Sequence, residues 1–208
     1  RYLEKQGDCT SFVILPEATS DGVALIGKNA DLPPYSLEVG VVIECKPDDM
    51  PAYLTVTLAG LVSYEGINEY GMGVTANFLD TGGWRHGVPR YMFPGIALTQ
   101  KTTSEAVSAI RRLHRASSRN VMILDQDHHA IGMELTPTKD AIYEPKNGIM
   151  YHANHFICES LLAEERSKGS FLSNSQARLK RMGELLQEHH GKINLDTMQD
   201  ILRDKTGQ

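Results

Sequence analysis

Short apolar runs separated by turn residues fill the first half of the chain. Four of these runs are rich in β-branched residues, and each is bounded by Gly, Pro, Asp or Ser, which is typical of β-strands. Two of them are nearly continuously apolar rather than alternating, which favours strands covered on both faces. The pattern predicts strands at residues 11–15, 23–26, 39–43, 53–58 and 72–77, with a turn at residues 66–71 before the last of them.

Helical and extended patterns alternate in the second half. Thr102 and Glu105 have the spacing of a capping box, and apolar residues then recur at helical intervals. The remaining elements are expected as strands at 121–124, 130–135 and 148–153 and as helices around 179–186 and 195–202. This order of elements favours sheets that are covered by layers of helices.

The composition limits the classes of function. A chain of 208 residues is long enough for one layered domain, and it contains no apolar run of the roughly 20 residues needed to cross a membrane. No basic segment followed by an apolar one marks a secretory signal. The net charge of −5 argues against a nucleic-acid partner. We therefore expect a cytoplasmic protein that acts on a small molecule, with neither nucleic acid nor membrane as its partner.

Basic residues and cysteines change this picture little. The dense basic stretch at residues 111–119 is expected to form the solvent-exposed face of a helix. The cysteines are Cys9, Cys45 and Cys158. They lack the spacing of zinc sites, and their odd number indicates reduced thiols. His152 and His155 are better explained as hydrogen-bonded histidines than as metal ligands, because no further ligand joins them at a recognisable spacing. Neither a metal nor a cofactor is expected.

Cys9 is the first candidate for chemistry. It stands at the head of a predicted strand, where the sheet would hold the residue while its thiol faces an open rim. Asp31 ends the next predicted strand, so a hairpin would return it towards Cys9. The residues alone also allow Cys9 to be a small buried core residue and Asp31 to cap the turn before Pro33. Both interpretations stay open at this level.

Several short motifs, taken in order, resemble those of the penicillin acyltransferase family, which comprises proteins like acyl-CoA:6-aminopenicillanic acid acyltransferase. Cys9-Thr-Ser-Phe followed by Gly27-Lys-Asn-Ala-Asp31 is similar to the start of the mature chain in that family. No single motif is decisive, but they occur in the family's order and cover nearly all of residues 7–190. The further matches are Gly66–Gly71, Val74–Asn77, Gly87–Arg90, the helix at 103–118, Glu134 with Thr136-Pro137, Tyr151–His155 and Arg178-x-x-Arg181.

The resemblance implies an α+β fold, the four-layer αββα sandwich of the N-terminal-nucleophile hydrolases. Residues 1–8 would be the end of a propeptide, and residues 9–208 a hydrolase domain that lacks its C-terminal part. The family has a further arginine beyond the last helix, a role that neither Arg178 nor Arg181 takes, so we expect the chain to be incomplete at both ends. By motif position, Cys9 would be the nucleophile, Asp31 its structural and electrostatic partner, Asn154 an oxyanion donor, and Asn77 a second donor or a pocket residue.

Cleavage of the Asp8–Cys9 bond would activate these residues. It would expose an α-amine with a pKa of about 7.7–8.0 beside a thiol that attacks only as thiolate. The family usually has glycine before the cysteine, and this chain has Asp8. The expected product is an amidase of α and β subunits from one precursor, with or without assembly into a homo-oligomer, that hydrolyses small N-acyl amides through a thioester. The alternatives are an acyltransferase that takes acyl-CoA as a substrate, and a non-catalytic binding module of the same fold.

Overall fold

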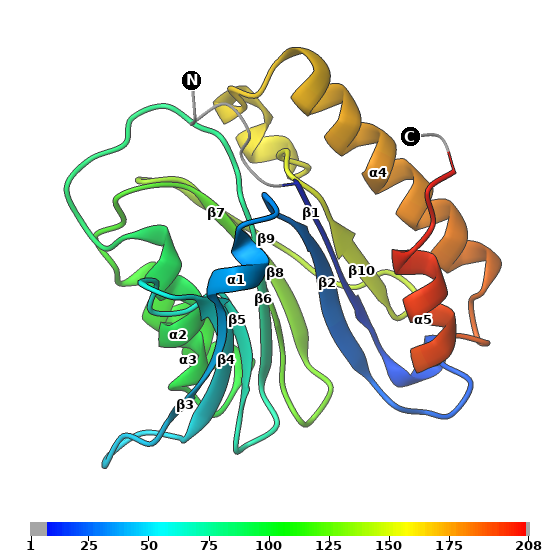
Figure 1. The fold of residues 1–208 in the computed structure, drawn as a ribbon, viewed down its shortest axis with the longest axis horizontal. Helices are drawn as coiled ribbons and strands as arrows, with labels where there is room; N and C mark the ends of the chain where they lie inside the picture. Colours follow the sequence, from blue (N-terminus) through cyan, green and yellow to red (C-terminus); the bar gives the residue numbers. More distant parts are fainter. Residues whose placement is uncertain (1–7, 207–208) are drawn as a thin grey trace.

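The computed structural model describes residues 8–206, in which two antiparallel sheets pack face to face and helices cover both outer faces (Figure 1). The smaller sheet has three strands in the order β10-β1-β2, with β1 at Asp8–Ile14, β2 at Leu25–Asp31 and β10 at Ile149–His152. The larger sheet has seven strands in the order β3 to β9. These are β3 Gly40–Cys45, β4 Tyr53–Leu58, β5 Glu65–Asn68, β6 Gly73–Asn77, β7 Arg119–Leu124, β8 Ala130–Leu135 and β9 Asp140–Tyr143.

Helices form the two outer layers. α2 (Phe93–Leu98) and α3 (Thr103–Arg111) pack on the larger sheet, whereas α4 (Gly169–Glu188) and α5 (Leu195–Leu202) pack on the smaller one (Figure 1). The predicted four-layer αββα sandwich is therefore confirmed. The short elements are α1 Ser36–Val39 and the 3-10 turns η1 Pro16–Ala18, η2 Arg90–Met92 and η3 Glu159–Glu164. Among residues 8–206, no helix combines the length and apolar character needed to cross a bilayer.

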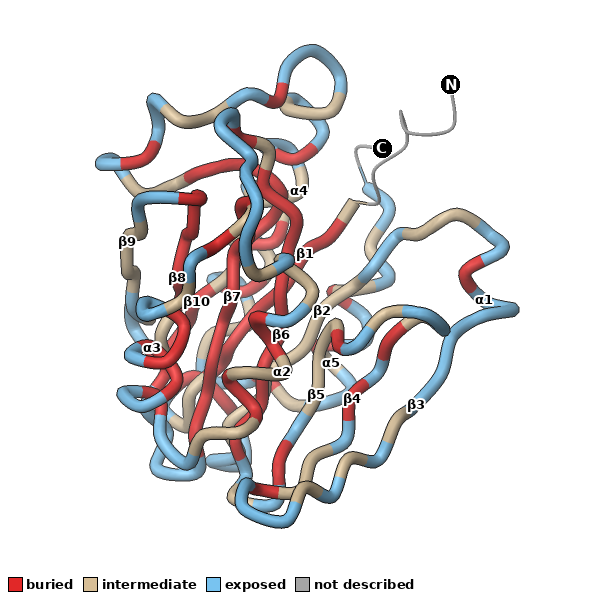
Figure 2. Tube along the Cα trace, turned by 90° about the vertical axis from the view of Figure 1, so that its left-hand side faces the viewer, coloured by how far each residue is buried: buried red, intermediate tan, exposed pale blue. Residues whose placement is uncertain are grey.

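The central strand β1 is buried on both faces, as its apolar sequence predicts (Figure 2). Phe12 and Ile14 pack in the core beneath α4 and α5. Val13, which points the opposite way, packs with Met122 between the two sheets. Burying each such side chain contributes about 1.5–3 kcal/mol. β1 is therefore a well-anchored support for Cys9 at its start.

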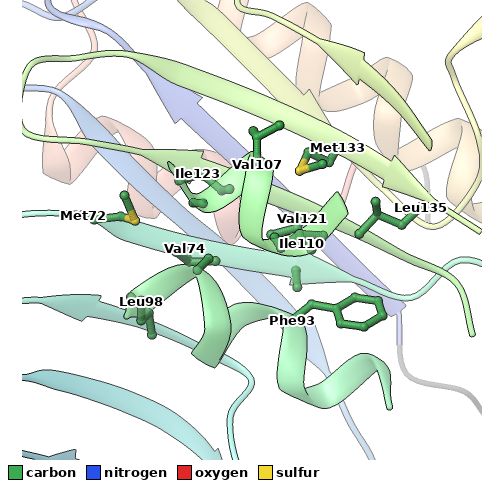
Figure 3. Packing of buried hydrophobic residues seen from close by; sticks show 13 residues of the cluster. Met72, Val74, Phe93, Leu98, Val107, Ile110, Val121, Ile123, Met133 and Leu135 are labelled. Atoms are coloured by element: carbon green, nitrogen blue, oxygen red, sulfur yellow. The ribbon is translucent and has the colours of Figure 1, made fainter. Parts of the chain in front are cut away.

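A second core lies between the larger sheet and its two helices (Figure 3). Its largest buried side chains are Met72, Val74, Phe93, Leu98, Ile110, Val121, Ile123, Met133 and Leu135. The capping box at the start of α3 is present, since the Thr102 side chain accepts from the Glu105 N–H and the Glu105 carboxylate accepts from the Thr102 N–H. The predicted start of this helix is confirmed.

Several sequence predictions differ from the structure. The predicted turn at 66–71 begins as strand β5, because Gly66 lets the chain pass so close to the Leu54 carbonyl of β4 that a Cβ would collide with it. Strand β3, whose predicted run at 39–43 is almost entirely apolar, is a largely exposed edge strand. The apolar pattern does not predict α2 or β9, which are too short to show a clear period.

The basic stretch at residues 111–119 is not the exposed face of a helix. α3 ends at Arg111 instead of continuing to residue 118, and the chain turns so that Arg119 begins β7. Arg115 is buried and donates to the Thr136 carbonyl (2.8 Å). Arg119 is also buried, with 1% of its surface exposed. Two of the cations that spacing assigns to solvent therefore lie inside the protein.

Candidate active site

Cys9 is the second residue of β1 and is fully buried. Side chains alternate along a strand, so Cys9 and Ser11 face the larger sheet, where the Ser11 hydroxyl donates to Met122 Sδ (3.0 Å). The Sγ of Cys9 lies 3.6 Å from the hydroxyl oxygen of Tyr64, which precedes β5. Asp8 faces α4 instead. The thiol and the backbone of Cys9 therefore meet two different groups of residues.

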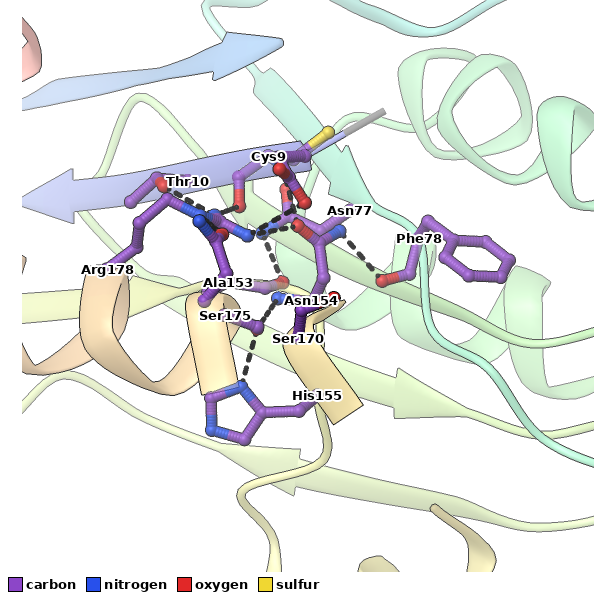
Figure 4. A network of polar contacts seen from close by, with 12 residues as sticks. Cys9, Thr10, Asn77, Phe78, Ala153, Asn154, His155, Ser170, Ser175 and Arg178 are labelled. Carbon is purple, nitrogen blue, oxygen red and sulfur yellow. Dashed lines mark hydrogen bonds and ion pairs between the residues drawn. The ribbon is translucent and has the colours of Figure 1, made fainter. Parts of the chain in front are cut away.

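Asn154 holds the amide nitrogen of Cys9 (Figure 4). It follows β10, whose pairing with β1 brings it beside the start of that strand. Its Oδ1 accepts from the Cys9 N–H (2.6 Å) and from Arg178 Nη2 (3.0 Å). Its Nδ2 donates to the Phe78 carbonyl (3.0 Å), which leaves one Nδ2 hydrogen for another acceptor. These bonds determine the orientation of the amide, with its oxygen towards Cys9.

Asn77 lies at the end of β6 and holds the segment that carries Asn154. Its Nδ2 donates to the carbonyls of His152 (3.0 Å) and Ala153 (2.9 Å). An amide nitrogen has only two hydrogens, so neither is available to an oxyanion in this structure. The geometry makes Asn77 a positioning residue for Asn154 rather than the second oxyanion donor that its place in the motif suggests.

Arg178 is a site residue to which the sequence assigns no role. It projects from α4, and its Nη1 donates to the Cys9 carbonyl (2.5 Å) and to Thr10 Oγ1 (2.9 Å). Its Nη2 bonds Asn154 and forms an ion pair with the Asp8 carboxylate (3.3 Å). One guanidinium thus binds the residues on both sides of the Asp8–Cys9 bond. The only sequence signal was the Arg-x-x-Arg motif, which does not show which arginine faces the strand.

Asp31 lies directly opposite Asp8 in the pairing of β1 with β2, and Cys9 lies opposite Ala30. Asp31 and Asp8 line a cavity of about 600 Å³ between these strands and α4 and α5, together with Arg178. Burial raises the pKa of Asp31, an effect that Arg178 opposes and Asp8 reinforces. No hydrogen bond joins Asp31 to Cys9 within residues 8–206. The structure places Asp31 near the backbone of the candidate nucleophile and on the opposite side of the strand from its thiol.

A buried acid–base pair supports the Asn154 segment from the other side. His152 Nε2 lies 2.8 Å from Glu134 Oε1, and both side chains are fully buried. The carboxylate also accepts from the N–H groups of Ile157 (2.6 Å) and Cys158 (3.0 Å). Burial alone would raise the pKa of Glu134, but the bonds from His152 and the two N–H groups outweigh it and lower that pKa. Glu134 is therefore a structural anion that ties β8 to the segment after β10.

Glu134→Gln should destabilise the fold by about 3–5 kcal/mol at pH 7, because an amide cannot accept from three donors and leaves buried N–H groups unpaired. The pKa of Glu134 is lower in the folded state than in the unfolded state. Its contribution to stability is therefore complete above the unfolded-state pKa of about 4.3, and it is lost as the pH falls through the folded-state pKa. Urea unfolding at pH 7 and pH 3 should therefore show that the difference in free energy of unfolding between the variant and wild type becomes smaller at pH 3. Glu164→Gln, at a partly exposed pair with Lys139, is the control and should change stability far less. A difference that is constant across this pH range would contradict the role given to Glu134.

The thiol side of Cys9 contains a cation and aromatic rings that sequence reasoning missed. Tyr64 contacts Sγ, and the guanidinium of Arg119 lies 4.8 Å from the centre of the Tyr64 ring and 5.0 Å from that of Tyr91. An arginine two positions before the apolar run at 121–124 was the one available signal. Across the described part of the chain, no group of three or more His, Cys, Asp or Glu side chains is placed to hold a metal ion.

Solved structures with the same fold are named as an amidase, a hydrolase and an acylase. An N-acylethanolamine-hydrolyzing acid amidase ortholog from Caenorhabditis elegans superposes with a TM-score of 0.72 at 16% identity, covering 95% of this chain and 87% of that one. A mutant of conjugated bile acid hydrolase from Clostridium perfringens has a TM-score of 0.67 at 18% identity, covering 93% and 78%. Penicillin V acylase from Agrobacterium tumefaciens has a TM-score of 0.54 at 12% identity, covering 93% and 63%. At these identities the likeness establishes the N-terminal-nucleophile hydrolase fold.

No curated protein matches the sequence. One protein family does, over residues 18–208, and it is described as acyl-coenzyme A:6-aminopenicillanic acid acyl-transferase. The matched range begins after Cys9, so the assignment of the nucleophile rests on the motif and on the geometry around it. The range includes the segments of Asp31, Asn77, Asn154 and Arg178. The chain therefore belongs to the acyl-coenzyme A:6-aminopenicillanic acid acyl-transferase family, as its ordered motifs predict.

Proposed function

We propose that this protein is a cysteine amidase, made active by cleavage of its own Asp8–Cys9 bond, that hydrolyses small N-acyl amides through a thioester at Cys9. The observation that carries the proposal is the 2.6 Å bond from the Cys9 N–H to Asn154 Oδ1. The nitrogen held by this bond is the leaving nitrogen in self-cleavage and the α-amine of the product. One contact therefore serves both the activation and the later reaction.

Self-cleavage begins with attack of Cys9 Sγ on the carbonyl carbon of Asp8. The bond from this carbon to the Cys9 nitrogen breaks, and the nitrogen takes up the proton that the thiol gives, which leaves a thioester and a free α-amine. Water then hydrolyses the thioester, which gives a main-chain α-carboxylate at Asp8 and a free thiol on Cys9. Arg178 supports this step because it holds the Cys9 carbonyl and the Asp8 side chain in one orientation.

Turnover repeats the same chemistry on a substrate amide. The α-amine takes the thiol proton, and the thiolate attacks the substrate carbonyl while the free Nδ2 hydrogen of Asn154 is the donor to the oxyanion. The tetrahedral intermediate collapses, and the leaving amine departs with the proton from the ammonium. Water, which gives its proton to the α-amine, then hydrolyses the thioester. Asp31 would supply the negative charge that favours the ammonium during these steps.

Transfer of the acyl group is the second candidate function, and the family's description favours it. An acyltransferase of this kind would form the same thioester, take its acyl group from acyl-CoA as a substrate, and pass it to an amine instead of water. The two reactions differ only in which nucleophile reaches the thioester. The three similar structures are named for hydrolysis or acylase activity, which is why we place hydrolysis first.

Trapping the thioester tests this proposal. The purified chain, mixed with a panel of N-acyl amides and acyl-CoAs and quenched in acid, should gain the mass of one acyl group on the peptide that begins at Cys9. Added hydroxylamine should divert the acyl group to a hydroxamate. If, at the same amount of acylated Cys9, an added amine accepts the acyl group more than about tenfold faster than water does, transfer is the function. A chain that keeps residues 1–8 and takes up no acyl group would be the non-catalytic binding module, and the proposal would be wrong.

A further inference from the structure

Arg119 is a buried charge with no hydrogen-bonding or ion-pair partner among residues 8–206. Its surface is 1% exposed, and within residues 8–206 its Nε and Nη2 form no hydrogen bond and its guanidinium forms no ion pair. Buried charges are normally paired or hydrogen-bonded, because an unpaired one strongly destabilises the folded state. The rings of Tyr64 and Tyr91 flank it and recover part of this cost through cation–π attraction. The rings do not provide the negative charge with which a buried guanidinium is ordinarily paired.

Lys28 offers a comparison in the same place. Its side chain is also buried, with 1% exposed, but it forms an ion pair with Glu65 (3.4 Å) and donates to the Ala76 carbonyl (2.9 Å). Its Nζ lies 3.7 Å from the centre of the Tyr64 ring. Two cations thus lie against one tyrosine, and of these two only Lys28 has a counter-ion among the described residues.

The hydroxyl of this tyrosine is directed at Cys9. Its oxygen lies 3.6 Å from Sγ, within the range for hydrogen bonds that involve sulfur. Burial raises the pKa of Tyr64 well above its ordinary value, and the nearby Cys9 raises it further, although Arg119 opposes the shift. Tyr64 therefore keeps its proton and can act as a donor. Positive charge next to the ring favours negative charge on the hydroxyl oxygen, as the effect of Arg119 on the pKa shows, and so strengthens the O–H group as a donor.

We infer that Tyr64 is a further catalytic residue, which donates its hydroxyl hydrogen to the sulfur of Cys9 when the thiol is ionised, and that Arg119 supplies the counter-charge for the thiolate. This inference rests on the proposed function only in taking Cys9 as the nucleophile. The thiol proton goes to the α-amine, Tyr64 keeps its own proton, and the sulfur electron pair stays available for attack. During the reaction, the Cys9 thiolate then provides the negative charge that no other described group supplies to the guanidinium of Arg119.

Other charged groups face Cys9 from the opposite side of β1. These are Asp8 on β1, Asp31 on β2 and Arg178 on α4. On the thiol side, Lys28 and Glu65 form a pair, and Arg90 lies against the Tyr91 ring at 5.2 Å. A change at Tyr64 or Arg119 leaves all of these groups in place. The difference between such a variant and wild type therefore isolates the proposed effect.

Alkylation of Cys9 by iodoacetamide, followed against pH in the full chain without substrate and resolved by peptide mapping, tests the inference. Tyr64→Phe keeps the ring and removes the hydroxyl, and the pH of half-maximal rate should rise by about one unit, which is a tenfold loss of thiolate at neutral pH. Arg119→Met should raise it by at least as much while the thermal midpoint of unfolding stays equal or increases, because an unpaired buried charge is removed. Each variant is compared with wild type in the same cleavage state, established by intact mass.

Tyr91→Phe is the matched control, because it keeps the second ring over Arg119 and removes a hydroxyl that has no contact with Sγ in the described structure. Its alkylation profile should coincide with that of wild type. If the Tyr64→Phe profile also coincides with wild type, or if Arg119→Met lowers only the thermal midpoint, both residues are structural and the inference is wrong. If Arg119→Met fails to fold, the Tyr64→Phe profile still decides whether the inference is right. No step of this test needs amidase activity, so it stays separate from a failure of the proposed function.

Discussion

Cys9→Ala should leave the chain uncut before residue 9 and should lower amide hydrolysis by about 10⁴-fold or more, since removal of a catalytic nucleophile typically has effects of this size. The alanine variant has no atom that can form the thioester, so both self-cleavage and turnover stop. Cys9 is a small side chain, and its loss removes little packing, so the thermal midpoint should change far less than the activity. Intact mass reports cleavage, and a timed assay with the substrate from the acyl-trapping panel reports turnover.

Cys158→Ala and Cys45→Ala are the matched controls for this result. Burial, reinforced by Glu134, raises the pKa of the Cys158 thiol to about 12, so this thiol should remain protonated and unreactive near neutral pH. Cys45 lies at the end of β3, an edge strand remote in the sheet order from the strands that surround Cys9. Both variants should cleave and turn over like wild type. Amidase activity that survives in Cys9→Ala, or that disappears in Cys158→Ala, would show that the nucleophile is not Cys9.

Asn154→Asp should lower kcat by about 100- to 1000-fold, which is the usual cost of losing one oxyanion donor. Aspartate keeps an oxygen for the Cys9 nitrogen and for Arg178, but it loses the Nδ2 group that bonds the Phe78 carbonyl and would donate to the oxyanion. KM should change less than kcat, because the donor acts mainly in the transition state. Steady-state kinetics on the cleaved chain, with folding checked by thermal unfolding, provide the measurement.

Asn154→Ala removes both halves of the amide and should be more damaging than Asn154→Asp. It loses the oxygen that orients the Cys9 nitrogen, so self-cleavage should also slow, and intact mass over time would record this. Asn29→Ala is the control, because the side chain of this neighbouring residue on β2 donates to the Leu202 carbonyl and, in the described structure, forms no hydrogen bond with Cys9. If Asn154→Asp and Asn154→Ala both turn over like Asn29→Ala, the oxyanion role belongs to another group.

Local sequence determined most of the fold, because strands and helices depend on periods of two and 3.6 residues that short segments display by themselves. The apolar run around Val13 predicted a strand buried on both faces, and the structure has Phe12 and Val13 in two different cores. Thr102 and Glu105 predicted the start of a helix through a capping box that is complete within four residues. The order of motifs, also a linear property, was sufficient to identify the family.

Tertiary structure decided what the site residues contact. Arg178 reaches the Cys9 carbonyl across 169 positions of sequence, and Tyr64 reaches the thiol across 55. The motif brought Asn77 into the site, but only the carbonyls facing its amide show that both hydrogens are already used. Spacing assigned Arg119 to the surface within a basic stretch, and the turn after α3 buries it against the rings of Tyr64 and Tyr91. Spacing along a chain specifies which residues share an element, whereas hydrogen bonds and charge pairing depend on atoms from separate elements that come together only when the sheets and helices pack.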